Sequence, residues 1–219
     1  MRILLLCALL VSGISFAEPF IELGLGKTFF KPTVPDGVWY QQTFPHQFQT
    51  QDTATRVGLG WKFNIRWSVS VNYLRLGSNS SNGQFVWDHD YDQNAHKCKA
   101  NCDAPYTFRA VDSAKGPELA LTRTFDSGTV SPYLRGGYYR MLHRVDVSCT
   151  TFDGGNCGTS FSGRVPMLFL GAGLRYKYFG LEVSYYKAID SGPEADFKAG
   201  FPISTKAIVP MLSVTIPLL

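Results

Sequence analysis

The stretch FLGAGLRYKYFGLEVSYY, residues 169–186, decides the fold of this chain, because bulky apolar residues alternate in it with small or polar ones. Leu170 and Tyr176 share one face of the run before Gly180, and the alternation resumes at Leu181. A period of two with one apolar face is the signature of a β-strand. Two such runs joined by a few turn residues predict an antiparallel hairpin with a short connection.

The same alternation recurs along the chain and predicts eight strands. They cover residues 20–30, 54–65, 67–73, 117–125, 130–143, 165–178, 181–188 and a last strand that ends at the C-terminus. Between them, three short turns alternate with four long polar connections, which lie at 31–53, 77–115, around the SCTTFDGGNC segment (148–157) and at 189–203. That asymmetry is typical of an outer-membrane barrel, which has short periplasmic turns and long external loops.

Residue chemistry separates a membrane barrel from a soluble exported barrel such as a lipocalin, which hides its apolar face around a ligand. Here the bulky face is too continuous to be left in water, whereas the Gly-rich, charged face suits a narrow lumen. Aromatic residues also gather beside the short turns, where a membrane-interface girdle would lie: Trp61, Phe63, Trp67, Phe125, Tyr133, Tyr176, Tyr178 and Phe179. The alternative is a soluble sandwich with ordinary aromatic strand ends. The sequence therefore predicts an all-β fold, a closed antiparallel eight-stranded transmembrane β-barrel with four long external loops and three short periplasmic turns.

The N-terminus has the three zones of a secretory signal, with Arg2, an apolar run over 3–11, and small residues at Ser15 and Ala17. We expect cleavage after Ala17, so that residues 1–17 are a cleavable signal peptide and 18–219 form one barrel domain. The formal net charge of +4 is modest, and no basic cluster follows any one segment. Nucleic acid is therefore not expected as a partner.

Three segments resemble the strand–turn–strand signatures of small OmpA/OmpX-like eight-stranded outer-membrane barrels, with OmpW-like barrels as the second choice. They are GLGWKFNIRWSVSVNY (58–73), SPYLRGGYYR (131–140) and FLGAGLRYKYFGLEVSYY (169–186). The resemblance implies a place in the bacterial outer membrane, in contact with its lipid and lipopolysaccharide. Such proteins usually end in an aromatic residue, whereas this chain ends in Leu219. Pro210 and Pro217 also remove hydrogen-bond donors from the final strand, so we expect a weak seam there.

Strand parity and direction place six charged residues in the periplasmic half of the lumen: Glu22, Lys62, Arg135, Arg175, Lys177 and Glu182. Buried charges must be paired, so the expected partners are Glu22 with Lys62, and Glu182 with Arg175 or Arg135. Two interpretations remain open. One is a structural plug of ion pairs, which eight strands favour because they leave room only for side chains, and the other is a gated, narrow pore.

Four cysteines follow the signal: Cys98, Cys102, Cys149 and Cys157. An even number in an exported chain indicates disulfides. Three pairings are possible, and pairing within each local segment is the simplest. A zinc site with His89 or His96 beside the first cysteine pair is the alternative, but its spacing matches no strong zinc pattern. The acidic run 88–92 lacks the turn glycine and closing glutamate of a calcium loop, so we expect neither a metal nor a cofactor.

Catalysis is the next hypothesis, since some small outer-membrane barrels modify lipid A. His143, Asp146 and Ser148 fall near one rim of the predicted barrel. No nucleophile motif frames Ser148, so we do not expect an enzyme.

The external loops are the expected functional part, because loops held on a rigid scaffold commonly carry binding sites. Their aromatic content exceeds what solvated linkers need, and the contact candidates are Trp39, Tyr40, Phe44, Phe48, Phe85 and Trp87. The sequence predicts a structural or surface-interaction protein for adhesion or recognition, with a host surface, a phage or another envelope protein as partner. The alternative is a narrow OmpW-like channel for small apolar compounds. An apolar funnel with a lateral opening would favour transport, and a filled lumen would favour display.

Overall fold

The computed structural model describes residues 18–33, 47–85, 91–92, 97–98, 106–125, 128–150, 155–189 and 203–218. Within these ranges the chain consists of strands and the turns that join them. No helix in this part of the chain is long and apolar enough to cross a membrane.

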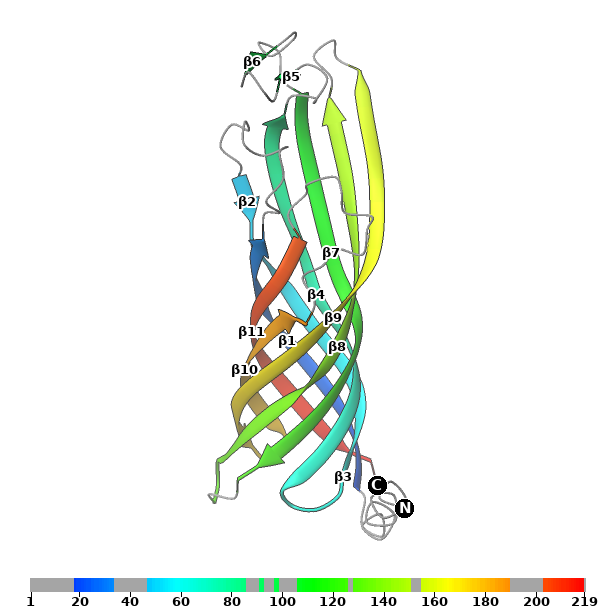
Figure 1. The fold of residues 1–219 in the computed structure, drawn as a ribbon. Coiled ribbons are helices and arrows are strands. Elements are labelled where there is room, and N and C mark those ends of the chain that lie inside the picture. The colour runs from blue at the N-terminus through cyan, green and yellow to red at the C-terminus, as the bar shows by residue number, and fades with distance from the viewer. Residues whose placement is uncertain are drawn as a thin grey trace.

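Nine strands pair into one antiparallel sheet that closes on itself (Figure 1). They are β1 (Glu18–Thr33), β2 (Gln47–Gln49), β3 (Gln51–Lys62), β4 (Trp67–Phe85), β7 (Tyr106–Thr124), β8 (Ser131–Thr150), β9 (Asn156–Tyr176), β10 (Phe179–Ala188) and β11 (Ile203–Pro217). Only Thr50 separates β2 from β3, and both pair with β4, so together they form one of eight barrel strands. The pairing of β4 with β7 closes the ring. The predicted closed antiparallel eight-stranded barrel is confirmed. Two further short strands, β5 (Tyr91–Asp92) and β6 (Lys97–Cys98), pair only with each other.

Register partners followed around the barrel show how strongly its strands are staggered. From Lys31 on β1 the row passes through β11, β10, β9, β8, β7, β4 and β3, and it returns to β1 at Ile21, ten residues from its start. A stagger of this kind goes with the tilt of the strands in a closed barrel, which is visible in Figure 1. Rows of paired residues therefore slope around the barrel, so residues at one height come from different rows.

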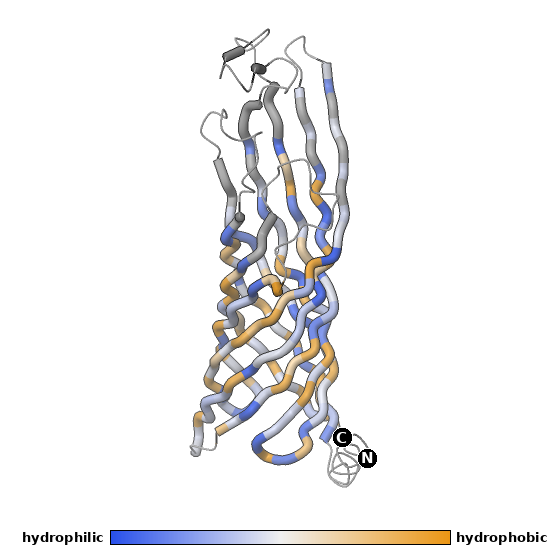
Figure 2. The backbone as a smooth tube through the Cα atoms, viewed as in Figure 1, coloured by the Kyte–Doolittle hydropathy of each residue, from blue (hydrophilic) through white to orange (hydrophobic). Residues whose placement is uncertain are grey.

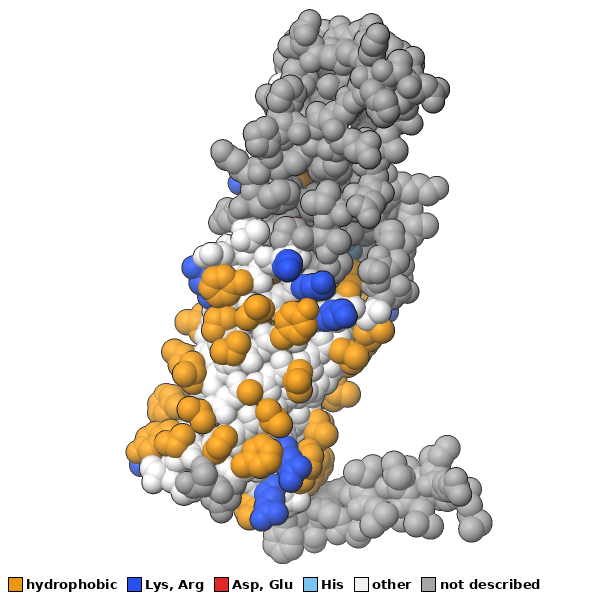
Figure 3. Space-filling view, turned by 60° about the vertical axis from the view of Figure 1, so that its left-hand side comes forward, with side chains coloured by type: hydrophobic (Ala, Val, Ile, Leu, Met, Phe, Trp, Pro, Cys, Tyr) orange, Lys and Arg blue, Asp and Glu red, His pale blue; other side chains and the backbone are white. Residues whose placement is uncertain are grey.

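The outer face of the barrel is apolar. In β10 every second residue from Phe179 is exposed and the residues between are buried. The exposed fraction reaches 66% at Leu170 and 65% at Leu212, and so continuous an apolar surface is not left in water by a soluble monomer. Figures 2 and 3 show hydrophobic residues along the lower part of the barrel and over its outside. This apolar band suits the hydrocarbon core of a membrane.

The short turns, the start of β1 and the end of β11 lie at one end of the barrel (Figure 1). The exposed aromatic residues of that end form the expected interface girdle: Trp61, Trp67, Phe125, Tyr176, Tyr178 and Phe179. Tyr133, also predicted for the girdle, is buried instead and points into the lumen, because it falls on the inward parity of β8. By the general rule for such barrels, the short-turn end is periplasmic and the opposite end is external.

Four strands continue well beyond the apolar band at the external end, which corrects the predicted lengths of two connections. Residues 77–85 of β4, 106–115 of β7, 144–150 of β8 and 156–164 of β9 form one paired sheet, called the external extension below. These segments are polar, and were therefore expected to be loops. In water both faces of a strand can be polar, so backbone pairing there needs no apolar alternation.

The final strand pairs on both sides, with a gap beside its proline. The ladder between β1 and β11 runs to Gly26 opposite Met211 and resumes at Phe29 opposite Ile208. Pro210, which has no N–H to donate, lies within that gap but remains paired in register with Val183 of β10. The barrel closes across this seam all the same.

Candidate functional site

Five charged side chains meet inside the barrel: Glu22 on β1, Arg56 on β3, Glu118 on β7, Arg135 on β8 and Glu182 on β10. Each lies on the inward parity of its strand, and each is at most 5% exposed. Their contact from five different strands makes a buried ionic cluster across the lumen. It is called the ionic cluster below.

Each arginine of the ionic cluster contacts all three glutamates. Arg56 reaches Glu22 at 3.1 Å, Glu182 at 3.0 Å and Glu118 at 3.4 Å. Arg135 reaches Glu22 at 2.8 Å, Glu118 at 2.7 Å and Glu182 at 4.0 Å. Because burial of a single unpaired charge is very unfavourable, this shared pairing is what allows five charges to sit inside the barrel.

Neutral donors surround the carboxylates. Tyr133 donates its hydroxyl to Glu182 at 3.2 Å, and Ser184 donates to the same carboxylate at 2.6 Å. Tyr186 donates to Glu118 at 2.7 Å, and Asn72 donates its amide to Glu118 at 3.0 Å. With three carboxylates and two guanidiniums, the ionic cluster carries a formal charge of −1. These hydroxyl and amide donors compensate the excess acceptor charge.

The structure brings three of the six predicted lumen residues together and leaves the other three outside. Glu22, Arg135 and Glu182 belong to the ionic cluster. The expected partner of Glu182 was Arg175 or Arg135, and in the structure it is Arg135. The expected pair of Glu22 with Lys62 was wrong. Lys62 is in register with Glu18, near the end of the barrel, and its Nζ lies 3.5 Å from that carboxylate.

Arg175 lies in the periplasmic half of the lumen, where the sequence placed it, but it is not the partner of Glu182, and Lys177 does not take its expected inward position. Arg175 stacks over the ring of Tyr133 at 5.1 Å and has no ion pair among those of the described residues. Lys177 sits in the turn after β9 with a φ of 51° and is exposed. That turn conformation breaks the parity from which an inward position was inferred.

Sequence reasoning did not place Arg56 and Glu118 in the ionic cluster, although both lie on polar faces. Glu22, Gly58, Asn72 and Glu118 follow one another in a single register row. Rows of paired residues slope around the barrel. Glu118 therefore lies at the height of Arg56, which is two residues from Gly58 on β3, and the two side chains are in contact. Strand parity combined with the stagger is the signal that could have found them.

An apolar layer fills the lumen on the external side of the ionic cluster. Its largest members are fully or almost fully buried: Leu74, Leu76, Tyr139, Met141, Met167, Tyr186, Val209 and Met211. Phe169 stacks on Tyr186 with ring centroids 5.0 Å apart. Glycines on the inner face leave room for this packing, since a Cβ at Gly171 would collide with the Ser184 hydroxyl. At the height of this layer the lumen is thus occupied by side chains.

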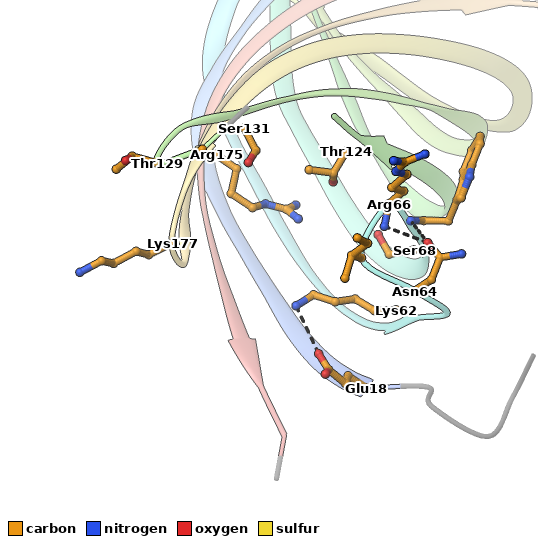
Figure 4. Close-up of a pocket in the computed structure, with 13 residues that line it drawn as sticks. Glu18, Lys62, Asn64, Arg66, Ser68, Thr124, Thr129, Ser131, Arg175 and Lys177 are labelled. Atoms are coloured by element: carbon orange, nitrogen blue, oxygen red, sulfur yellow. Dashed lines mark hydrogen bonds and ion pairs between the residues drawn. The ribbon is translucent and has the colours of Figure 1, made fainter. Parts of the chain in front are cut away.

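The periplasmic mouth is hollow. A cavity of about 560 Å³ lies between the ionic cluster and the short turns, and Figure 4 shows Arg175 reaching into it. Its cationic lining consists of Lys62, Arg66, Arg175 and Lys177, and Glu18 is its one described acidic residue. The cavity is a basic vestibule that ends at the filled lumen.

The three residues of the catalytic hypothesis do not form one site. His143 is buried inside the barrel, and its Nδ1 lies 3.7 Å from Asp112. Asp146 and Ser148 are exposed on the opposite face of β8, where Asp146 pairs with Arg144 at 2.9 Å and Ser148 donates to the carbonyl of Arg109. Strand parity separates them, since odd and even residues of β8 point to opposite sides.

The cysteine and loop predictions fall partly outside the described residues. Cys149 and Cys157 are register partners at the external ends of β8 and β9. Cys98 is the last residue of β6, while Cys102, His89, His96 and most of the acidic run 88–92 lie outside the described residues. Of the aromatic candidates, Phe48 and Phe85 belong to β2 and β4, and Trp39, Tyr40, Phe44 and Trp87 lie outside. No metal-binding group is found among the described residues.

A closed barrel with an apolar outer band, a charged cluster buried in its interior, and short turns at one end is an outer-membrane β-barrel. The chain is therefore a protein of the bacterial outer membrane with eight transmembrane strands.

Neither a protein-family model nor a curated protein matches the sequence. Among solved structures, the chain is similar to Ail, the attachment invasion locus protein of Yersinia pestis, in complex with the heparin analogue sucrose octasulfate. The sequence identity is 13% and the TM-score is 0.41, and the match covers 92% of this chain and 99% of that one. It is also similar to neisserial surface protein A, at 10% identity and a TM-score of 0.42, covering 92% and 99%. For OprG of Pseudomonas aeruginosa the values are 13% and 0.41, covering 91% and 93%. At such identities no residue's role is transferred to this chain.

Proposed function

We propose that this protein is a surface-interaction protein whose barrel carries the external extension into the surroundings of the cell. The observation that carries the proposal is the contrast between the two halves of the molecule. The lumen is filled by the ionic cluster and the apolar layer, while four strands continue as a paired sheet beyond the apolar band.

The external extension has the surface of a part that stands in water. Among those of its residues whose side chains the structure describes, none of the exposed ones is a large hydrophobic residue. Its exposed residues are instead polar or charged: Asn82, Arg109, Arg144, Asp146, Ser148, Thr150, Asn156, Ser160, Ser162 and Arg164. A rigid sheet that presents polar side chains and the connecting segments is suited to recognition, because the scaffold reduces the ordering cost of binding.

The tip of the extension is held by a disulfide between Cys149 and Cys157 in this proposal. The two residues are opposite each other in an antiparallel pair, and the Cα separation of such pairs, about 4.5 to 5.5 Å, lies within the range that disulfides need. Peptide mapping of the unreduced protein by mass spectrometry should recover a Cys149–Cys157 cross-linked peptide. Recovery of both as free thiols, or of either bonded to Cys98 or Cys102, contradicts this pairing.

The partner proposed for the extension is a host surface, with a phage or another envelope protein as the other candidates. Its test shortens the β8–β9 hairpin without touching the barrel. In the variant, residues 145–161 are replaced by Asn-Gly, which joins the register partners Arg144 and Ser162 through a favoured two-residue turn.

Bacteria producing the full-length chain, the shortened variant or neither are compared for attachment to cultured epithelial cells. Attachment should be high only for the full-length chain, while a heat-dependent gel shift shows that both proteins are folded barrels. Equal attachment of the two variants, or attachment no higher than without the protein, contradicts adhesion by this sheet.

The alternative function, a narrow channel for small apolar compounds, would be favoured by an apolar funnel with a lateral opening, and display by a filled lumen. The ionic cluster is charged and the layer beyond it is closely packed. Both features favour display over transport.

A further inference from the structure

Three lysines stand side by side on the outer wall of the barrel. Lys31 on β1 is the register partner of Lys206 on β11, and Lys206 is the register partner of Lys187 on β10. Directly opposed residues of antiparallel strands have Cβ atoms about 4.5–5.5 Å apart. The three ammonium groups, called the lysine row below, therefore belong to one small patch.

The lysine row marks the external edge of the apolar band. Lys31 and Lys187 are exposed and Lys206 is half-buried, all on the outward parity of their strands. Two residues nearer the periplasm, the next outward row consists of Phe29, Ile208 and Tyr185, which are 38–47% exposed and apolar or aromatic. Figure 3 shows Lys and Arg side chains gathered along the upper border of the hydrophobic surface. The row is thus at the depth of lipid headgroups in the outer leaflet.

The described part of the chain offers these lysines no anionic partner on the outer wall. The acidic residues of β1 and β10 are Glu18, at the periplasmic rim, and Glu22 and Glu182, inside the lumen. Directly opposed like charges destabilise a strand pair. An anion from outside the described chain would remove that repulsion.

Other cations extend the same edge around the barrel. Arg75 on β4 is the register partner of Lys115 on β7, and both are exposed. Arg140 and Arg164 are exposed on β8 and β9. The only exposed acidic residue described on these outer strand faces is Asp146, which is paired with Arg144.

We infer that the lysine row binds the phosphate groups of the lipid A part of lipopolysaccharide in the outer leaflet. The inference rests on the contact with lipopolysaccharide that the resemblance to small outer-membrane barrels implies, and it names the site of that contact. Lysine is a compact charge with three rotatable donors, so three adjacent lysines fit a lipid with more than one phosphate, whose oxygens need no fixed planar geometry.

The test measures lipid binding by native mass spectrometry of the folded protein in detergent containing EDTA, so that divalent cations do not bridge charges. The lipids are bisphosphorylated lipid A, the same lipid A after phosphatase treatment, and phosphatidylglycerol. The proteins are the wild type, the variant K31Q/K187Q/K206Q, and a control variant, R66Q/R123Q/K177Q, which loses three charges at the periplasmic end.

Wild type and control should bind bisphosphorylated lipid A alike. The lysine-row variant should bind it roughly 100-fold more weakly, which corresponds to about fivefold per lysine near a membrane surface. Dephosphorylated lipid A and phosphatidylglycerol should bind the wild type as weakly as that variant binds lipid A. Equal binding by the lysine-row variant and the wild type, equal loss in the control, or equally tight binding of phosphatidylglycerol overturns the inference. Attachment to host cells is measured in a separate experiment. If lipid A binding fails, the proposed adhesive role is unaffected, and if attachment fails, the lipid A site is unaffected.

Discussion

At the scale of single residues, the ionic cluster is unequal in its charges. Arg56 and Arg135 each serve three carboxylates, so losing either leaves the buried site with three carboxylates and one guanidinium. Losing the charge of one glutamate instead balances the formal charges. Removing one partner of a buried ion pair is strongly destabilising because the remaining charge stays buried.

Two substitutions of similar size test this inequality. R135Q should lower the free energy of unfolding by about 3–5 kcal/mol, whereas E22Q should lower it by clearly less, because it leaves two carboxylates facing two guanidiniums. Urea titration of the protein refolded into lipid vesicles, followed by the mobility of folded and unfolded bands, measures both. R123Q, which changes an exposed arginine on the same barrel, serves as control. A cost for E22Q equal to that of R135Q would show that net charge does not govern the cluster.

At the scale of elements, β4 bends where it leaves the barrel for the external extension. Its register with β7 shifts between Arg75 and Gly77, and Gly77 has a φ of +88°. Asp52 of β3 stabilises the bend, since its carboxylate accepts from the Ser78 backbone N–H at 2.6 Å and from the Ser78 hydroxyl at 2.9 Å. A side chain at Gly77 would meet the Asp52 carboxylate and would also be held at an unfavourable φ.

Replacing this glycine should therefore weaken the junction. G77A is expected to cost about 1–3 kcal/mol of stability, read from the same urea titration. G136A is the matched control, because a Cβ at Gly136 would find only ordinary contacts, 3.4 Å and beyond, and its φ is not positive. If both variants unfold at the same urea concentration, the bend does not depend on a glycine at position 77.

At the scale of the whole molecule, the barrel is divided into layers along its axis. The basic vestibule opens to the periplasm, the ionic cluster and the apolar layer follow, and the external extension stands beyond. An ion that enters the vestibule meets the buried ionic cluster and then a packed apolar layer. Crossing the apolar layer would require removing the ion from water without replacement ligands.

The layered interior leads to a prediction for conductance. Reconstituted into planar bilayers, the folded protein should leave conductance near that of bare lipid, while a general porin added to the same chamber shows its usual steps. The heat-dependent gel shift of the same preparation verifies that the silent protein is a folded barrel. Regular single-channel steps from this protein would contradict a filled lumen and support the interpretation of the barrel as a narrow pore.

The sequence alone determined the architecture, because a barrel wall imposes one rule on every residue: its side chain points to lipid or to the lumen. Leu170, Leu174 and Leu181 obey that rule within their own strands, so alternation along the chain was enough to predict the strands, their order and the ends at which they turn. Alternation did not predict the strands at the polar segments 77–85 and 106–115. The outer face is in water there, so outward side chains need not be apolar.

Only the tertiary structure decided which charges meet. The pairing of Arg56 with Glu118, or of Lys31 with Lys187 through Lys206, depends on the stagger between strands, and the stagger is a property of the closed ring. A shift of two residues preserves every inward and outward position but exchanges every neighbour, so parity could assign Glu22 to the lumen without finding its partners. The physical reason is that the direction of a side chain, inward or outward, depends on its own strand alone. Its height along the barrel axis depends on the register of all eight strands together.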